Sequence, residues 1–214
     1  MDTTFIVDSS VCDDSSNWNR LLYFIQTLVT YFNVSPSGGR IALIQFSTGA
    51  NVVLKFNTLT GSLLNDAEVN RRVGLLKCQG GFRRIDKALD LVEKELLTPA
   101  GGVRDVSRPV LVITTGKQTA DQGLYTRLSI AVQGIKNKGV TVYAVGVGRA
   151  ADMAELLEIA SAPEYVFRSQ SFKRLQNLTS GLRGEFCVGN DLQMFDANTV
   201  FGNDICPIPM DTTF

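Results

Sequence analysis

Asp8 and Ser10 stand at the end of a short apolar strand, residues 3–7, just before the chain enters a helix. In an open α/β sheet, ligands bind beyond the carboxyl ends of the strands, so a carboxylate and a hydroxyl lie here where a site would be. Asp and Ser are also preferred helix N-caps. Their position in the sequence alone therefore favours Asp8 and Ser10 as a helix N-cap over a ligand-binding site.

The composition excludes several kinds of chemistry. The 214 residues include no histidine, so Ser-His-Asp or Cys-His catalysis within this chain is excluded. Lys and Arg number 21, as do Asp and Glu, and no basic run indicates a nucleic acid or an anionic membrane as partner. No apolar stretch reaches the roughly 18 residues of a membrane span. The absence of a signal peptide predicts an intracellular chain or a fragment of a longer one.

Strands and helices are expected to alternate along the chain. Apolar runs predict strands at 3–7, 40–46, 51–56, 108–114, 140–147 and 165–167, and helical spacing predicts helices at 17–32, 63–76, 85–97, 124–135, 153–160 and 172–182. This alternation is typical of a doubly wound α/β fold. We expect a mostly parallel six-stranded sheet with helices on both faces, in which the close pair at 40–56 supplies one antiparallel edge strand.

Two parts of the chain differ in composition. Residues 1–186 carry the periodic pattern and are expected to form one domain, whereas residues 187–214 are rich in Asn, Asp, Gly and Pro and are expected to form a tail or linker. The chain begins and ends with Met-Asp-Thr-Thr-Phe, at 1–5 and 210–214. Such self-similarity predicts that the tail leads into the start of another tandem unit. A duplication introduced in cloning is the alternative.

Four segments in this order resemble the von Willebrand factor A (VWA) domain, of the type found in collagen VI, matrilins and cochlin. They are Phe-Ile-Val-Asp-Ser-Ser at 5–10, Gly-Gly-Phe-Arg-Arg-Ile-Asp-Lys-Ala-Leu at 80–89, Val-Leu-Val-Ile-Thr-Thr-Gly-Lys at 110–117, and Tyr-Ala-Val-Gly-Val-Gly at 143–148. The resemblance covers about residues 2–186. It implies the Rossmann-like fold of that family and a site at the carboxyl edge of the sheet.

The family's metal-ion-dependent adhesion site needs Asp-x-Ser-x-Ser, a Thr and an Asp around magnesium or manganese. Asp8 and Ser10 match, but Cys12, Arg83 and Thr115 replace the other three positions. Hard cations prefer oxygen ligands, so the resemblance with these departures implies no metal cofactor. Arg83 could instead pair with Asp8 or point to solvent. Residual magnesium or manganese binding stays open, since another register could bring in Asp86 or Thr114.

Four cysteines, Cys12, Cys78, Cys187 and Cys206, allow three pairings. The resemblance places the loops of Cys12 and Cys78 side by side, which implies a Cys12–Cys78 disulfide and a second one, Cys187–Cys206, in the tail. Disulfides favour an oxidising compartment, although four reduced thiols in a cytosolic domain remain the alternative. Asn33 and Asn177 begin N-x-Ser/Thr triplets, which are glycosylation acceptors in secreted proteins.

The resemblance implies a non-enzymatic, secreted adhesion module of the extracellular matrix. Its partner would be collagen, another matrix protein or other VWA units of the same protein, bound by loops 9–16, 79–84 and 115–123. Arg83, Arg84 and Lys117 would make this rim basic, or they are ordinary solvated charges. A structural spacer or self-assembly domain and metal-dependent adhesion are the alternatives. Nucleotide binding is disfavoured, because Gly146-Val147-Gly148 lacks the further glycine that opens a phosphate-binding helix.

Overall fold

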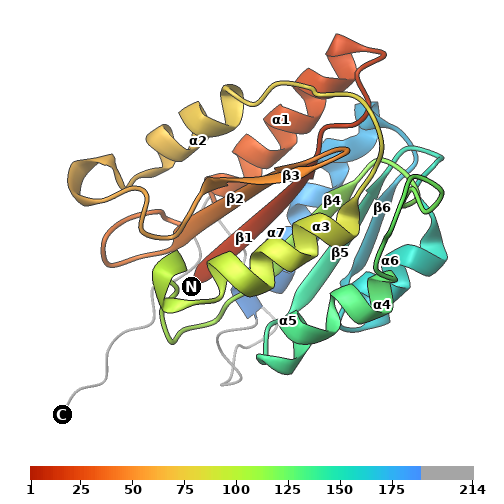
Figure 1. Ribbon diagram of the computed structural model, residues 1–214. Coiled ribbons are helices and arrows are strands. Elements are labelled where there is room, and N and C mark those ends of the chain that lie inside the picture. Colours follow the sequence, from red (N-terminus) through yellow and green to blue (C-terminus); the bar gives the residue numbers. More distant parts are fainter. Residues whose placement is uncertain (189–214) are drawn as a thin grey trace.

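A twisted six-stranded sheet forms the centre of the protein (Figure 1). The computed structural model describes residues 1–188, with side chains to 184. The strands are β1 (Asp2–Asp8), β2 (Arg40–Phe46), β3 (Ala50–Leu54), β4 (Val110–Thr114), β5 (Val142–Val147) and β6 (Val166–Ser169), in the order β3-β2-β1-β4-β5-β6. All neighbours pair in parallel except β2 and β3. The predicted doubly wound α/β class is confirmed.

Helices cover both faces of the sheet, as Figure 1 shows. The helices are α1 (Ser15–Val29), α2 (Asp66–Gly74), α3 (Ile85–Leu91), α4 (Leu128–Ala131), α5 (Gln133–Asn137), α6 (Met153–Ile159) and α7 (Thr179–Val188). A π-helical turn, η2 (Val92–Leu96), extends α3, and shorter 3-10 turns are η1 (Gly61–Leu63), η3 (Pro99–Gly101), η4 (Pro163–Tyr165) and η5 (Phe172–Leu178). No helix among residues 1–188 is long and apolar enough to cross a membrane.

Alternation along β1 divides the core into two layers. Phe5 and Val7 pack with the apolar stripes of α1 and α2, and Ile6 packs with those of α3 and α6. Successive side chains of a strand point to opposite faces, so a strand covered on both sides reads as an unbroken apolar run. β1 and β4 are buried along their whole length, and this buried frame fixes where their polar carboxyl ends lie.

The start of α1 corrects the expected helix cap. Asp14 is the N-cap of α1, and its carboxylate accepts a hydrogen bond from the Ser16 N–H. Because this capping role belongs to Asp14, Asp8 is free for other contacts. The interpretation of Asp8 and Ser10 as an N-cap is therefore wrong.

The helix expected over 124–135 is shorter than its apolar spacing suggests. α4 begins only at Leu128, and the Leu124 side chain is 98% exposed. The preceding backbone is held by side chains, since Arg84 donates to the Leu124 carbonyl and the Thr126 N–H donates to Asp86. These bonds replace the hydrogen bonds that a helix would make, so residues 124–126 stay a loop.

Parallel pairing brings the carboxyl ends of β1, β2 and β4 to one edge. Asp8 pairs in register with Phe46 of β2, and Val7 pairs with Ile113 of β4. The loops that leave these strands therefore meet at this edge, which we call the upper edge. The expected division into a domain at 1–186 and a tail at 187–214 stays a prediction, because residues 189–214 lie outside the described residues.

Candidate functional site

Asp8 is the centre of the upper edge. Its side chain is fully buried, and three near donors satisfy the carboxylate: Ser10 N–H at 2.9 Å, Thr115 N–H at 2.8 Å and the Thr115 hydroxyl at 2.7 Å. The Thr114 hydroxyl lies 3.3 Å from Asp8 Oδ2, the oxygen that also accepts both hydrogen bonds from Thr115. A buried carboxylate is tolerated only when it is hydrogen-bonded in this way. Sequence reasoning missed this role of Thr115, although its place directly after β4 could have indicated it.

Arg83 lies beside this carboxylate. Its Nε is 3.5 Å from Asp8 Oδ2 and donates to the Thr115 hydroxyl at 3.3 Å. The hypothesis that Arg83 pairs with Asp8 thus has support, but the bidentate contact is absent, and neither Nη1 nor Nη2 donates to any of the described residues. The guanidinium lies against Gly116, where an added Cβ would be 2.8 Å from Arg83 Cζ. Gly116 is a second residue that the sequence did not single out.

Backbone hydrogen bonds hold the loop that carries Arg83 in place. Gln79 and Gly80 both donate their N–H groups to the Ser9 carbonyl at 2.9 Å. Arg83 and Thr119 bond reciprocally, since the Arg83 N–H donates to the Thr119 hydroxyl and the Thr119 N–H donates to the Arg83 carbonyl. A side chain on a loop fixed on both sides loses little further freedom when it binds something.

A disulfide joins two of the loops at the upper edge. Cys12 and Cys78 are bonded, with their Cα atoms 5.6 Å apart, as the family resemblance implied. Cys12, which stands where the family motif has its second serine, is thereby bonded to sulfur and offers no oxygen ligand. Cys187 lies in α7 beyond the described side chains and Cys206 lies outside the described residues, so their pairing stays a prediction.

Arg84 behaves differently from its neighbour. It is only 7% exposed, and it forms a bidentate contact with Asp86 at 2.9 and 2.8 Å. Arg84 is too buried to belong to the expected basic rim, because Asp86 takes its Nε–Nη2 edge and Nη2 also donates to the Leu124 carbonyl. Lys117 is exposed, and its Nζ lies 3.5 Å from Asp152 Oδ2.

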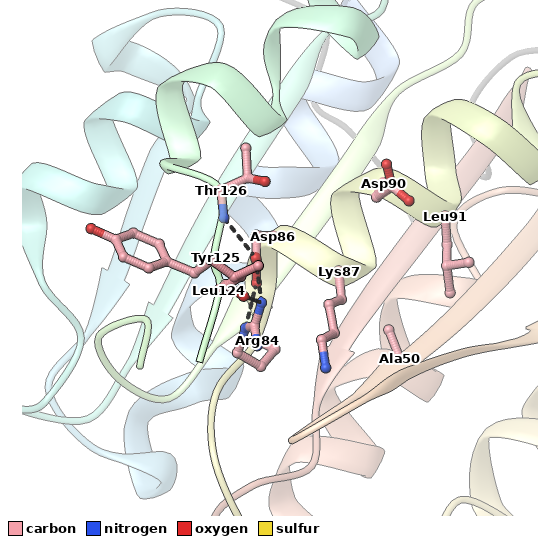
Figure 2. Close-up of a pocket in the computed structure, with 9 residues that line it drawn as sticks. All are labelled: Ala50, Arg84, Asp86, Lys87, Asp90, Leu91, Leu124, Tyr125 and Thr126. Atoms are coloured by element: carbon pink, nitrogen blue, oxygen red, sulfur yellow. Dashed lines mark hydrogen bonds and ion pairs between the residues drawn. The ribbon is translucent and has the colours of Figure 1, made fainter. Parts of the chain in front are cut away.

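Figure 2 shows the Arg84–Asp86 pair in a groove that Ala50, at the start of β3, also lines. The volume of this groove is about 460 Å³. Burial raises the pKa of Asp86, but hydrogen bonds from Arg84 and from the Thr126 N–H, together with the Arg84 charge, lower it further, so the pKa lies below the usual range. The lining residues are Ala50, Arg84, Asp86, Lys87, Asp90, Leu91, Leu124, Tyr125 and Thr126. Since Asp86 is engaged there, it does not join Asp8 in a metal site, and the alternative register for a metal loses this carboxylate.

The upper edge does not fit a divalent cation. Such an ion needs several oxygen ligands in near-octahedral geometry, but Asp8 Oδ2 already accepts two short hydrogen bonds and the Arg83 guanidinium brings its positive charge to that atom. The Ser10 hydroxyl is buried and has no partner among the described residues, but one such hydroxyl falls short of the several ligands that a divalent ion needs. In the described part of the chain, no three acidic or cysteine side chains gather into a group that could hold a metal.

The two predicted glycosylation acceptors occupy unlike positions. Asn33 is half-buried with a positive φ of 46°, and its carbonyl accepts from the Gly39 N–H across the loop that precedes β2. Asn177 is exposed on η5. Glycosylation at either residue stays a prediction, and Asn177 is the more accessible of the two.

Comparisons with known proteins agree with the geometry. Residues 2–181 match the model of the von Willebrand factor type A domain. Human matrilin-4 is 30% identical over 87% of this chain and 29% of its own length, and the human collagen alpha-1(XX) chain is 31% identical over 76% of this chain and 12% of its own length. The chain thus spans less than a third of these relatives, which are extracellular matrix proteins.

Solved structures share the fold. Proximal thread matrix protein 1 from the mussel byssus aligns with a TM-score of 0.78 and 24% identity, over 87% of this chain and 48% of that protein. The same protein has been solved with a zinc-occupied MIDAS motif, and that structure aligns with a TM-score of 0.76 and 23% identity, again over 87% of this chain and 48% of that one.

Proposed function

This chain belongs to the von Willebrand factor type A domain family, and from that premise we propose that it is a non-enzymatic adhesion module that binds collagen or another matrix protein without a divalent metal. One observation carries the proposal: Arg83 Nε lies 3.5 Å from the buried Asp8 carboxylate. A guanidinium at this distance supplies the positive charge that a metal would supply. Adhesion would then need no ion.

The contact surface would be the upper edge, formed by the loops at 9–16, 79–84 and 115–123. Arg83 and Lys117 are its proposed contact residues, and both are at least partly exposed. Phe82 is 41% exposed next to Arg83 and offers apolar area. Aromatic and Arg side chains are enriched in the energetically important centres of interfaces.

A secreted location in the extracellular matrix fits this proposal. The matched relatives are matrix proteins, and the Cys12–Cys78 disulfide would persist in an oxidising compartment. Exposed Asn177 would be available for glycosylation there. The proposed partners are accordingly matrix proteins, including other VWA units of the same protein, and include neither nucleic acid nor membrane.

Solid-phase binding to fibrillar collagen tests the proposal directly. Saturable binding in EDTA, unchanged by added magnesium or manganese, is the expected result. Binding that requires magnesium or manganese would overturn metal independence and would favour adhesion through a residual site at Asp8 and Ser10. A panel of other matrix proteins on the same plates covers partners other than collagen.

A structural spacer or self-assembly domain is the second candidate. The Met-Asp-Thr-Thr-Phe sequence at both 1–5 and 210–214 favours it, because tandem units would place many copies of one surface in a row. Absence of binding to every immobilised protein, together with concentration-dependent association in sedimentation experiments, would favour this candidate over adhesion.

A further inference from the structure

We infer that Arg83 binds a carboxylate side chain of the partner protein directly through its Nη1 and Nη2 groups. This inference rests on the proposed adhesive function and names the chemistry of the contact. Arg83 uses only Nε toward Asp8 and Thr115, so the fork formed by its two terminal nitrogens makes no hydrogen bond to the described residues. A guanidinium edge with two unused N–H donors matches the two oxygens of a carboxylate.

The position of the fork is fixed before any partner arrives. The Arg83 backbone is tied to Thr119 by two hydrogen bonds, and its guanidinium lies against the backbone of Gly116. Its side chain is 25% exposed, so it is reachable but mostly surrounded by protein. A contact made by a fixed, partly desolvated arginine is stronger than one made by a mobile surface lysine.

A second free donor lies on the loop that follows β1. The Ser10 hydroxyl is buried and has no hydrogen-bond partner among the described residues, while the Ser10 N–H already donates to Asp8. Buried hydroxyls are normally paired, and an oxygen from a ligand would satisfy this one. The upper edge therefore offers hydrogen-bond donors to an incoming group. Asp8 Oδ2 is not a free acceptor for it, because that atom already accepts from Thr115.

Charge balance favours a single carboxylate over a polyanion. Arg83, Arg84 and Lys117 each have an acidic neighbour: Asp8, Asp86 and Asp152, respectively. The net field of these three pairs is therefore weak, whereas sulfated polysaccharides bind surfaces that carry an excess of positive charge. A carboxylate needs only the bidentate fork, and this is what Arg83 retains.

The first test is independent of the identity of the partner. In NMR spectra of the 15N-labelled chain, the blocked peptide Ac-Gly-Glu-Gly-NH2 should shift the Arg83 side-chain resonances saturably, and Ac-Gly-Gln-Gly-NH2 should not. The Arg84 resonances serve as an internal control, because Asp86 already occupies that guanidinium. Equal shifts with both peptides, or no shift of Arg83 with either, would overturn the inference even if the chain binds collagen.

The second test uses collagen in EDTA. Arg83→Gln should weaken binding by about 10- to 100-fold, the range expected for a hydrogen bond to a charged group, and Arg83→Lys should recover only part of that loss. Exposed Arg168 on β6 is the matched control, and Arg168→Gln should bind like the parent chain.

Amidating the carboxylates of collagen should weaken the parent chain but should not weaken Arg83→Gln further, because both changes remove the same contact. Additive losses, or binding that heparin abolishes but amidation leaves intact, would overturn the inference. If the parent chain binds no matrix protein at all, the proposed function fails, and the peptide titration alone decides the inference.

Discussion

The two ends of β1 carry the same pair of residue types with different outcomes. Asp2 at the lower end and Asp8 at the upper end are both buried, and each has an arginine beside it, Arg104 and Arg83. At the lower end, Arg104 donates both its N–H and its Nε to the Asp2 carboxylate, and its Nη2 also donates to the Gly38 carbonyl. At the upper end, Arg83 approaches Asp8 through Nε alone.

The difference lies in what else satisfies each carboxylate. Thr115 and the Ser10 N–H saturate Asp8, so Arg83 is not required for its solvation. Among residues 1–188, Arg104 supplies every donor to the Asp2 carboxylate, and it is thereby committed to the fold. An arginine beside a carboxylate is therefore available to a ligand when other donors have already satisfied the acid.

The disulfide should account for the largest effect at the upper end. The double variant Cys12→Ser/Cys78→Ser should lose about 4 kcal/mol of unfolding free energy, since the bond joins residues 66 apart and the cost of closing so long a loop returns to the unfolded chain. Guanidinium unfolding measures the loss. A loss below about 1 kcal/mol would mean that hydrogen bonds alone fix this edge.

The next largest effect should be the difference in stability between variants of Arg104 and Arg83. Arg104→Ala should destabilise the fold by about 3 kcal/mol, because it leaves Asp2 buried and unpaired, whereas Arg83→Ala should cost about 1 kcal/mol or less. Urea unfolding of the two variants, with exposed Arg168→Ala as control, measures both effects. Equal losses would erase the distinction between a structural arginine and an available one.

The sequence predicted the frame better than the site. Buried strands such as β4 read as apolar runs, and the hairpin of β2 and β3 followed from its short turn, so topology could be predicted. Arg83 and Arg84 are adjacent and chemically identical, and only their three-dimensional neighbours decide that one is buried against Asp86 and the other is partly free. Asp86 is two residues from Arg84, but Asp8 and Thr115, which lie beside Arg83, come from distant loops that residue spacing alone does not bring together.

Residues 124–126 show the same limit. Leu124 continues the apolar spacing of a helix, yet side chains from the start of α3 take its carbonyl and hold the segment as a loop. Local periodicity describes what a segment can form alone, and it omits competing hydrogen bonds from elsewhere in the chain. The predicted helix was therefore wrong at its first turn, and from Leu128 onward the segment is helical in two pieces, α4 and α5.

A change at Gly116 should alter the upper end with little effect on stability. In Gly116→Ala, the new Cβ would lie 2.8 Å from Arg83 Cζ and 2.9 Å from its Nε, so the guanidinium must move from its present position. We expect a change in unfolding free energy within about 0.5 kcal/mol and a loss of binding to the Glu peptide close to that of Arg83→Gln. Gly49→Ala, where an added Cβ meets nothing within 4 Å, is the control. Unchanged peptide binding would show that the position of the guanidinium is unimportant.

Metal removal should have the smallest effect on the parent chain. A variant in which metal dependence is restored is the sharpest test of the contrast between the two ends of β1. EDTA, magnesium and manganese should leave the thermal midpoint of the parent chain unchanged, because Arg83 holds the positive charge beside Asp8. The variant Arg83→Thr/Thr115→Asp removes that charge and adds a second carboxylate, so its midpoint should rise with magnesium or manganese, as binding to the folded state requires. A metal-dependent rise in the parent chain would instead mean that Arg83 moves aside, and the upper end would then resemble an ordinary adhesion site. If metal leaves the thermal midpoints of both the variant and the parent chain unchanged, the obstruction to metal binding would lie at the Cys12–Cys78 disulfide, which both chains retain.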